Sequence, residues 1–96
     1  MITIEIKNRF NGNVIFSHTC EDNTIKKTVE EAVQRNASLV NASLRGASLV
    51  NASLDNASLD GASLVNASLV NASLDGASLD GASLRGASLA GSGCIS

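Results

Sequence analysis

The chain has 96 residues, a formal net charge of −2, no proline, no tryptophan and two cysteines. Its 44% of hydrophobic residues include no long apolar run, so we expect a small soluble protein without a membrane span. The N-terminus also lacks the basic and apolar stretches of a signal peptide, which favours a cytoplasmic location where cysteines stay reduced.

The first segment has the pattern of a β-hairpin. Residues 2–7 alternate apolar and polar side chains, as a half-buried strand does. Asn11 and Gly12 form a strong tight-turn signal, and residues 14–16 then predict the returning strand.

A short amphipathic helix is expected next. After a polar connection at residues 18–23, residues 24–35 carry apolar side chains at helical spacing, and Asp22 or Asn23 is placed to cap the helix. We therefore predict an N-terminal cap domain at residues 1–35, which covers the open end of the structure that follows.

From Ala37 onward the chain repeats Ala-Ser-Leu plus two variable residues, eleven times over. A period of five would scatter the leucines around an α-helix and would send alternate leucines to opposite faces of a straight strand. The period fits a backbone that is extended for about three residues and then turns a corner, so that the chain winds around its own interior. The leucines expected in this core are Leu39, Leu44, Leu49, Leu54, Leu59, Leu64, Leu69, Leu74, Leu79, Leu84 and Leu89.

The corner residues support this interpretation. A type II turn needs a positive φ at its third residue, which favours Gly or Asn. With Leu39 as the first turn residue the third is Asn41, and every equivalent position along the array is also Gly or Asn. The serine of each unit is expected to point outward and to bond nearby backbone groups.

These units resemble the pentapeptide-repeat family, whose units are Ala, then Asp or Asn, then Leu, then two loose positions. The resemblance covers residue 36 to about residue 95 and departs from the family in having Ser at the middle position. It implies an all-β solenoid, a right-handed quadrilateral β-helix with four units per coil and about three coils. Residues 92–96 continue the register as a degenerate last unit, so we expect an array domain at residues 36–96.

Four units per coil would stack the aspartates of the variable position in two columns. Like charges about 5 Å apart repel by roughly 1 kcal/mol in water, so we expect a solvated face whose charges are tolerated and not stabilising. The resemblance implies an alternative, because some family members resemble double-stranded DNA and protect DNA gyrase from quinolones. The candidate acidic face consists of Asp55, Asp60, Asp75 and Asp80.

No constellation of side chains predicts catalysis. The side chains of His18, Cys20, Glu21 and Asp22 match no zinc-ligand spacing, and they lie in a segment expected to be a polar connection. The single histidine lies in the cap, while the serines serve the repeat. We therefore expect no catalytic residue, metal, cofactor or small-molecule substrate, and no direct binding of nucleic acid.

The array is unusually regular, since all three fixed positions hold in all eleven units behind an irregular cap. This favours a synthetic consensus array joined to a natural-like cap, with a structural or scaffold function. An uncovered last coil further predicts an end-to-end homodimer through Leu89, Cys94 and Ile95. A third alternative takes the flat Ser and Val faces as an ice-binding or surface-binding plane.

Overall fold

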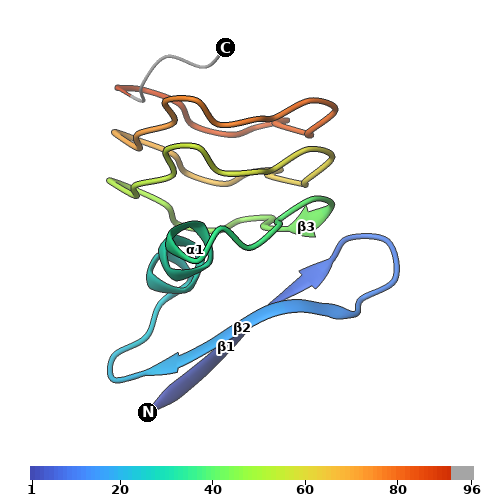
Figure 1. Ribbon diagram of the computed structural model, residues 1–96. Coiled ribbons are helices and arrows are strands. Elements are labelled where there is room, and N and C mark those ends of the chain that lie inside the picture. The colour runs from blue at the N-terminus through green and yellow to red at the C-terminus, as the bar shows by residue number, and fades with distance from the viewer. Residues whose placement is uncertain (92–96) are drawn as a thin grey trace.

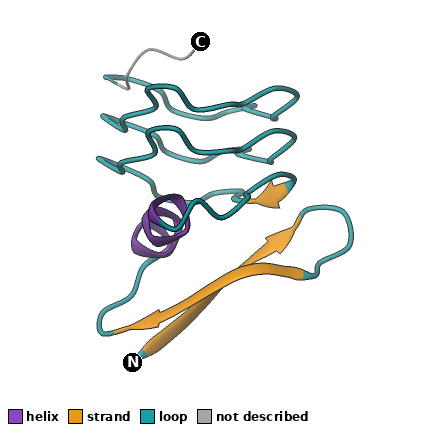
Figure 2. Ribbon diagram, viewed as in Figure 1, coloured by secondary structure: helices purple, strands orange, loops and turns teal. Residues whose placement is uncertain are grey.

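A computed structural model describes residues 1–91 of the chain. Its elements are β1 (Ile2–Asn8), β2 (Val14–Cys20), α1 (Ile25–Gln34) and β3 (Ala42–Ser43). The hairpin lies at one end, α1 lies beside it, and the rest of the chain rises from them in stacked layers (Figure 1). Most of the layered part is drawn as turns and not as strands, because each extended stretch is very short (Figure 2).

β1 and β2 form an antiparallel hairpin in which Ile2 pairs with Cys20 and Ile6 pairs with Phe16. The register shifts after Ile6, where β2 carries one extra residue. Gly12 occupies the connecting loop with a φ of 74°, in agreement with the predicted turn.

The second strand is longer than the sequence predicts. It continues to Cys20, so the prediction of a polar connection beginning at residue 18 is wrong for its first three residues. Those residues keep the alternation of a strand, because His18 and Cys20 are half-buried and Thr19 is exposed. Cross-strand pairing with Ile2 and its neighbours in β1 therefore outweighs the polar character of the segment.

The N-cap of α1 is Thr24, whose side-chain oxygen accepts a hydrogen bond from the backbone N of Lys27 at 3.1 Å. The prediction of Asp22 or Asn23 as the cap is therefore wrong, although it places the start of the helix within two residues. All three side chains favour caps, so their sequence could not decide among them.

The side chain of Asn23 does not cap the helix but joins the hairpin to it by hydrogen bonds. It is only 6% exposed. Its Nδ2 donates to the carbonyl oxygens of Ile2 at 3.2 Å and His18 at 2.8 Å, and its Oδ1 accepts from the Thr28 hydroxyl at 3.1 Å. These bonds hold the start of α1 against both strands.

The C-terminus of α1 leads directly into the repeats. Asn36 has a φ of 56°, its N–H bonds to the Val33 oxygen at 3.0 Å, and the Ala37 N–H bonds to the Ala32 oxygen at 2.9 Å. This pair of bonds is a Schellman motif, with Asn in the left-handed position where glycine is more common. It turns the chain sharply from the helix axis into the first repeat.

The repeats stack with a period of 20 residues. Ser43 bridges to Ser63 in parallel, and Ser63 bridges to Ser83, so that four five-residue units complete one circuit. Equivalent parallel bridges join Ser48 to Ser68, Ser53 to Ser73, Ser58 to Ser78 and Ser68 to Ser88. We call residues 37–56 layer 1, residues 57–76 layer 2 and residues 77–91 the described part of layer 3.

Each corner between residues 39 and 87 is closed by a backbone hydrogen bond. At the first corner the Ala42 N–H bonds to the Leu39 oxygen at 3.0 Å, and Asn41 between them has a φ of 62°. All of the predicted third-position residues, Gly and Asn alike, have a positive φ. The prediction that Gly and Asn mark the corners is therefore confirmed.

Leucine and alanine fill the interior of the layers. The eight leucines from Leu39 to Leu74 are at most 2% exposed, whereas Leu79, Leu84 and Leu89 in layer 3 are partly buried. Within residues 1–91 the serines are exposed or half-buried, with the exception of Ser63, which is only 2% exposed. The core is thus continuous from α1 to layer 2.

The hairpin and the helix both contact layer 1. Lys7 and Asn8 of β1 pair with Ser43 and Ala42 of β3, which gives a sheet of order β2-β1-β3. On another side of layer 1, Glu30 of α1 accepts a hydrogen bond from the Ser53 backbone N at 2.8 Å. Backbone groups of layer 1 at Ala42, Ser43 and Ser53, which have no layer beneath them, therefore bond to the N-terminal elements. Among residues 1–91, no helix is long and apolar enough to cross a membrane.

Candidate interaction surfaces

The candidate metal ligands of the sequence do not converge. His18 and Cys20 are half-buried on the inner face of β2, whereas Glu21 and Asp22 are exposed in the connection to α1. Residues 1–91 contain no group of three or more His, Cys, Asp or Glu side chains that could hold a metal ion, and their surface has no pocket. The four aspartates of the candidate acidic face lie elsewhere, on the outside of the layers.

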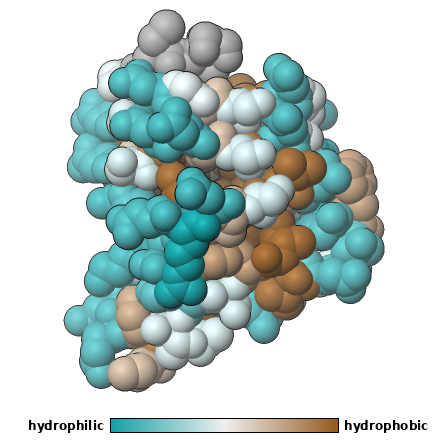
Figure 3. Space-filling model, in the orientation of Figure 1, coloured by the Kyte–Doolittle hydropathy of each residue, from teal (hydrophilic) through white to brown (hydrophobic). Residues whose placement is uncertain are grey.

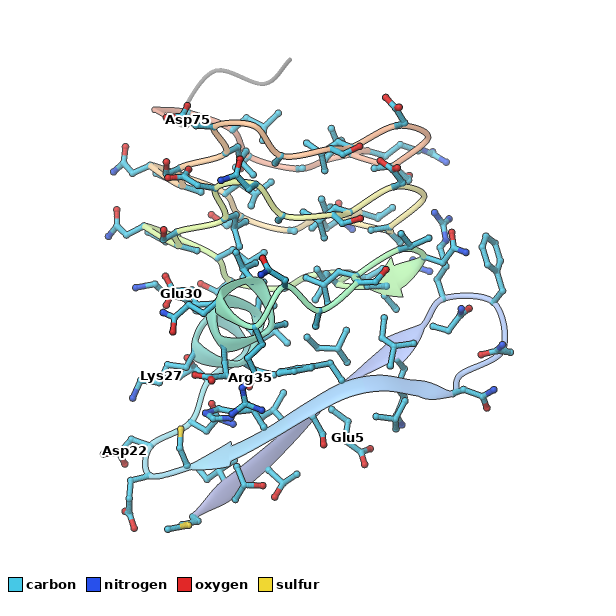
Figure 4. All side chains as sticks on the ribbon, viewed as in Figure 1. Glu5, Asp22, Lys27, Glu30, Arg35 and Asp75 are labelled. Carbon is cyan, nitrogen blue, oxygen red and sulfur yellow. The ribbon has the colours of Figure 1, made fainter. Side chains whose placement is uncertain are left out.

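The four aspartates gather around one side of the layered stack. Asp55 and Asp75 occupy the same corner of successive layers, and Asp60 and Asp80 occupy the next corner along the chain. Between these corners runs the side on which Ser58 bridges to Ser78. We call these four residues the acidic face, and Figure 4 labels Asp75 at its corner near the top of the stack.

The lower aspartate of each column bonds to the layer above it. Oδ1 of Asp55 accepts hydrogen bonds from the Ser73 hydroxyl and, at 3.1 Å, from the backbone N of Asp75. Oδ1 of Asp60 likewise accepts from the Ser78 hydroxyl. Its second donor is the backbone N of Asp80, at 3.0 Å.

These bonds bear on two expectations. The columns are not merely tolerated, because a hydrogen bond to a charged group contributes about 1.5–3 kcal/mol, which exceeds the roughly 1 kcal/mol of repulsion between two exposed like charges. The repeat serines also bond in two ways: the Ser38 hydroxyl oxygen accepts from the backbone N of Val40 at 3.4 Å, as expected, whereas Ser73 and Ser78 donate to carboxylates of the layer below. Each of these last two serines lies 18 positions after an aspartate, a spacing that gains meaning only from the 20-residue period of the layers.

Exposure divides the acidic face into two pairs. Asp55 and Asp60 are half-buried, with one carboxylate oxygen engaged, whereas Asp75 and Asp80 are exposed. The upper pair therefore presents the more accessible negative charge to solvent or to a partner.

A second relationship between layers appears at the corners that carry asparagine. A Cβ built on Gly61 would lie 2.2 Å from Oδ1 of Asn41, directly below it. The same arrangement recurs for Gly76 above Asn56, Gly86 above Asn66 and Gly91 above Asn71. At these corners glycine thus provides both the positive φ and the space for an amide side chain of the layer below.

The opposite side of the stack carries basic and apolar side chains at its corners. Arg45, Val65 and Arg85 form one corner column, and a column of Val50, Val70 and Ala90 forms the next. Negative and positive side chains of the array are therefore separated onto opposite sides. Of the candidate end-to-end contact, Leu89 is partly buried in layer 3, while Cys94 and Ile95 lie outside the described residues.

The stacked five-residue units, with their leucine interior and left-handed corners, define a repeat protein. Pentapeptide repeats are matched in eight copies, over residues 37–76 and 62–92. These matches cover more than half of the chain, so the protein belongs to the pentapeptide-repeat family. No curated protein matches the sequence significantly.

Proposed function

We propose that the protein is a structural scaffold without catalytic activity, whose property is to hold side chains at fixed corners of a stiff stack. The observation that carries this proposal is the buried leucine column from Leu39 to Leu74, sealed at one end by α1 and the hairpin. The layers are further proposed to be coils of the right-handed quadrilateral β-helix that the family implies. Four corners in every 20 residues support that geometry.

The scaffold proposal predicts that layers are interchangeable units. A chain in which residues 57–76 are duplicated gains one complete circuit with every leucine still facing inward, so we expect its melting temperature to rise. The matched control duplicates residues 57–75, which is one residue short of the period and turns the leucines of layer 3 out of register. Equal melting temperatures for the two insertions would overturn the proposal.

We also propose that the array is a synthetic consensus sequence joined to a natural-like cap. The support is that Ala, Ser and Leu keep their places in all eleven units, and that the cap shows no such repetition. The occurrence of residues 37–89 unchanged in a genome would contradict this origin.

A second candidate function is favoured by the acidic face, which would bind the DNA-binding surface of a gyrase or another topoisomerase by imitating a phosphate backbone. The support is the placement of four carboxylates on two adjacent corners, with Asp75 and Asp80 exposed. A gyrase supercoiling assay tests it.

For this assay, all four aspartates of the acidic face are replaced by asparagine, which removes charge but keeps the Oδ1 acceptor of the interlayer bonds. Inhibition by the parent protein and its loss in this variant would support the function. The control Arg45→Gln with Arg85→Gln changes charge on the opposite side and leaves the acidic face intact. No inhibition by the parent, or equal inhibition by all three proteins, would exclude it.

Self-association through layer 3 is proposed as well. Leu79, Leu84 and Leu89 are less buried than the leucines beneath them, which leaves apolar surface for a second copy. The test is light scattering of the parent and of the Ile95→Lys variant at high micromolar concentration. We expect the average mass of the parent to exceed that of the variant, and equal masses or a monomeric parent would contradict the proposal.

A further inference from the structure

One side of the molecule forms a ladder that runs through both the array and the cap. Ser83, Ser63 and Ser43 are joined by parallel bridges, β1 then pairs antiparallel with β3, and β2 pairs with β1. The hairpin therefore extends this side of the stack by two strands (Figure 1). β2 is the last strand of the ladder at its N-terminal end.

The outer edge of β2 is open within residues 1–91. The backbone of β2 pairs with β1, and the His18 carbonyl oxygen also accepts from the Asn23 side chain. No other strand of the described chain pairs with β2. Seven consecutive residues thus present the backbone edge of a sheet to solvent.

This edge lacks the usual protection against pairing. Edge strands of natural sheets are commonly guarded by charged side chains, proline or a covering element, yet the sequence of β2 is VIFSHTC, with no proline and no Asp, Glu, Lys or Arg. The hairpin does carry charges, but Glu5 and Lys7 lie on β1, whose second edge pairs with β3 at Lys7 and Asn8.

Apolar surface accompanies the open edge. Val14, at the start of β2, is 47% exposed, and Ile15 and Phe16 are only partly buried against the core. Figure 3 shows hydrophobic surface on this face of the molecule, between the hairpin and the lowest layer. A strand placed along β2 would cover part of it.

We propose that β2 is a self-association surface, which pairs antiparallel with β2 of a second copy of this chain about a two-fold axis at Ser17. An antiparallel edge is complementary to itself, so one strand satisfies the backbone groups of its own copy. Phe16 then faces His18 of the second copy, Ile15 faces Thr19, and no like charges meet. The ladder becomes continuous from one array to the other.

Disulfide trapping tests this pairing at its centre. In a Cys20→Ser, Cys94→Ser background, Ser17→Cys places two thiols at the two-fold axis, where opposite Cα atoms lie about 4.5–5.5 Å apart, within the range that a disulfide spans. We expect a covalent dimer on mild oxidation with glutathione disulfide. The matched control is Thr3→Cys, which is exposed on the same face of the hairpin but belongs to β1.

A charge substitution tests the affinity. Ser17→Lys puts two ammonium groups at the axis, while within its own chain it lies opposite Glu5, so the monomer keeps its fold. We expect the dissociation constant from sedimentation equilibrium to rise by about tenfold or more. Thr3→Lys adds the same charge to β1 and is expected to leave the constant within about twofold.

Four results would overturn the proposal, and the first three concern self-association. These three are a parent chain that is monomeric at high micromolar concentration, cross-linking of Ser17→Cys no faster than that of Thr3→Cys, and a dissociation constant unchanged by Ser17→Lys. Performing the experiments with Ile95→Lys present separates this surface from contacts through layer 3. Binding of an added extended peptide to β2 without self-pairing would identify a different occupant and would also overturn it.

Discussion

Oδ1 of Asp55 accepts a hydrogen bond from the backbone N of Asp75, 3.1 Å away and one layer above. Two residues of the same charge are thereby joined, because the lower one bonds to the backbone of the upper one and not to its side chain. The Ser73 hydroxyl donates to the same oxygen, so one carboxylate holds two groups of the next layer. The charge column is thus also a hydrogen-bond ladder between layers.

The first prediction concerns this ladder. Asp55→Ala removes the acceptor for the Ser73 hydroxyl and the Asp75 N–H, and we expect the free energy of unfolding to fall by about 1–3 kcal/mol. Asp55→Asn keeps Oδ1 and is expected to lose less than half as much. Urea denaturation measures both, with Asp75→Ala at an exposed position of the same column as control. A loss for Asp55→Ala no larger than that for Asp75→Ala would contradict the ladder.

The second prediction concerns the leucine column. Leu64 is 1% exposed in layer 2, with layers on both sides of it, so Leu64→Ala leaves a cavity and is expected to lower the free energy of unfolding by about 2–5 kcal/mol. Leu84 occupies the same side one layer higher and is only partly buried, so Leu84→Ala is expected to lose less. Thermal and urea unfolding of the two variants measure the difference. Equal losses would mean that burial does not decide the contribution of a leucine.

The local features of the array could be predicted from the sequence because each requires only neighbouring residues. A corner needs a positive φ, which Gly and Asn supply, and the Leu two positions before it must point inward if the chain turns there. Because this pattern recurs in eleven consecutive units, few other backbone conformations can satisfy it. The period of four units per layer came from the resemblance to the family and not from spacing.

The features that could not be predicted depend on contacts between distant residues. The serine that donates to Asp55 lies 18 positions away, so its partner is visible only once the layers are stacked. Three adjacent polar residues could cap the helix. The side chain of Asn23 bonds instead to the carbonyl oxygens of Ile2 and His18, and Thr24 is the residue that caps. Likewise, β2 continues through polar residues because β1 lies alongside it.

The third prediction separates two roles of a corner glycine. Gly61→Ala forces an alanine to a φ of +72° and places its Cβ against Oδ1 of Asn41. We expect a loss of about 1–2 kcal/mol from the backbone conformation alone. In the double variant Asn41→Gly, Gly61→Ala the contact is absent and only the backbone loss remains. A double-mutant cycle by urea denaturation gives the coupling between the two sites, and a coupling of zero would show that the Asn41 amide moves aside freely.

The fourth prediction concerns the contact between α1 and layer 1. Glu30, labelled in Figure 4, accepts a hydrogen bond from the backbone N of Ser53 at 2.8 Å, where no lower layer supplies a carbonyl oxygen. Glu30→Ala removes this acceptor, so we expect the Ser53 amide to exchange its hydrogen with solvent at least about tenfold faster, a rise that corresponds to about 1.4 kcal/mol of lost protection.

Glu30→Gln keeps a side-chain oxygen and is expected to retain most of that protection. The internal reference is the Ser68 amide, which bonds to the Ala47 oxygen at 2.9 Å between layers and does not depend on the helix. Hydrogen exchange followed by NMR resolves both amides in one experiment. If the Ser53 amide exchanges at the parent rate in Glu30→Ala while the Ser68 amide is unchanged, the helix covers layer 1 by apolar contact alone, and the carboxylate has no part in closing its edge.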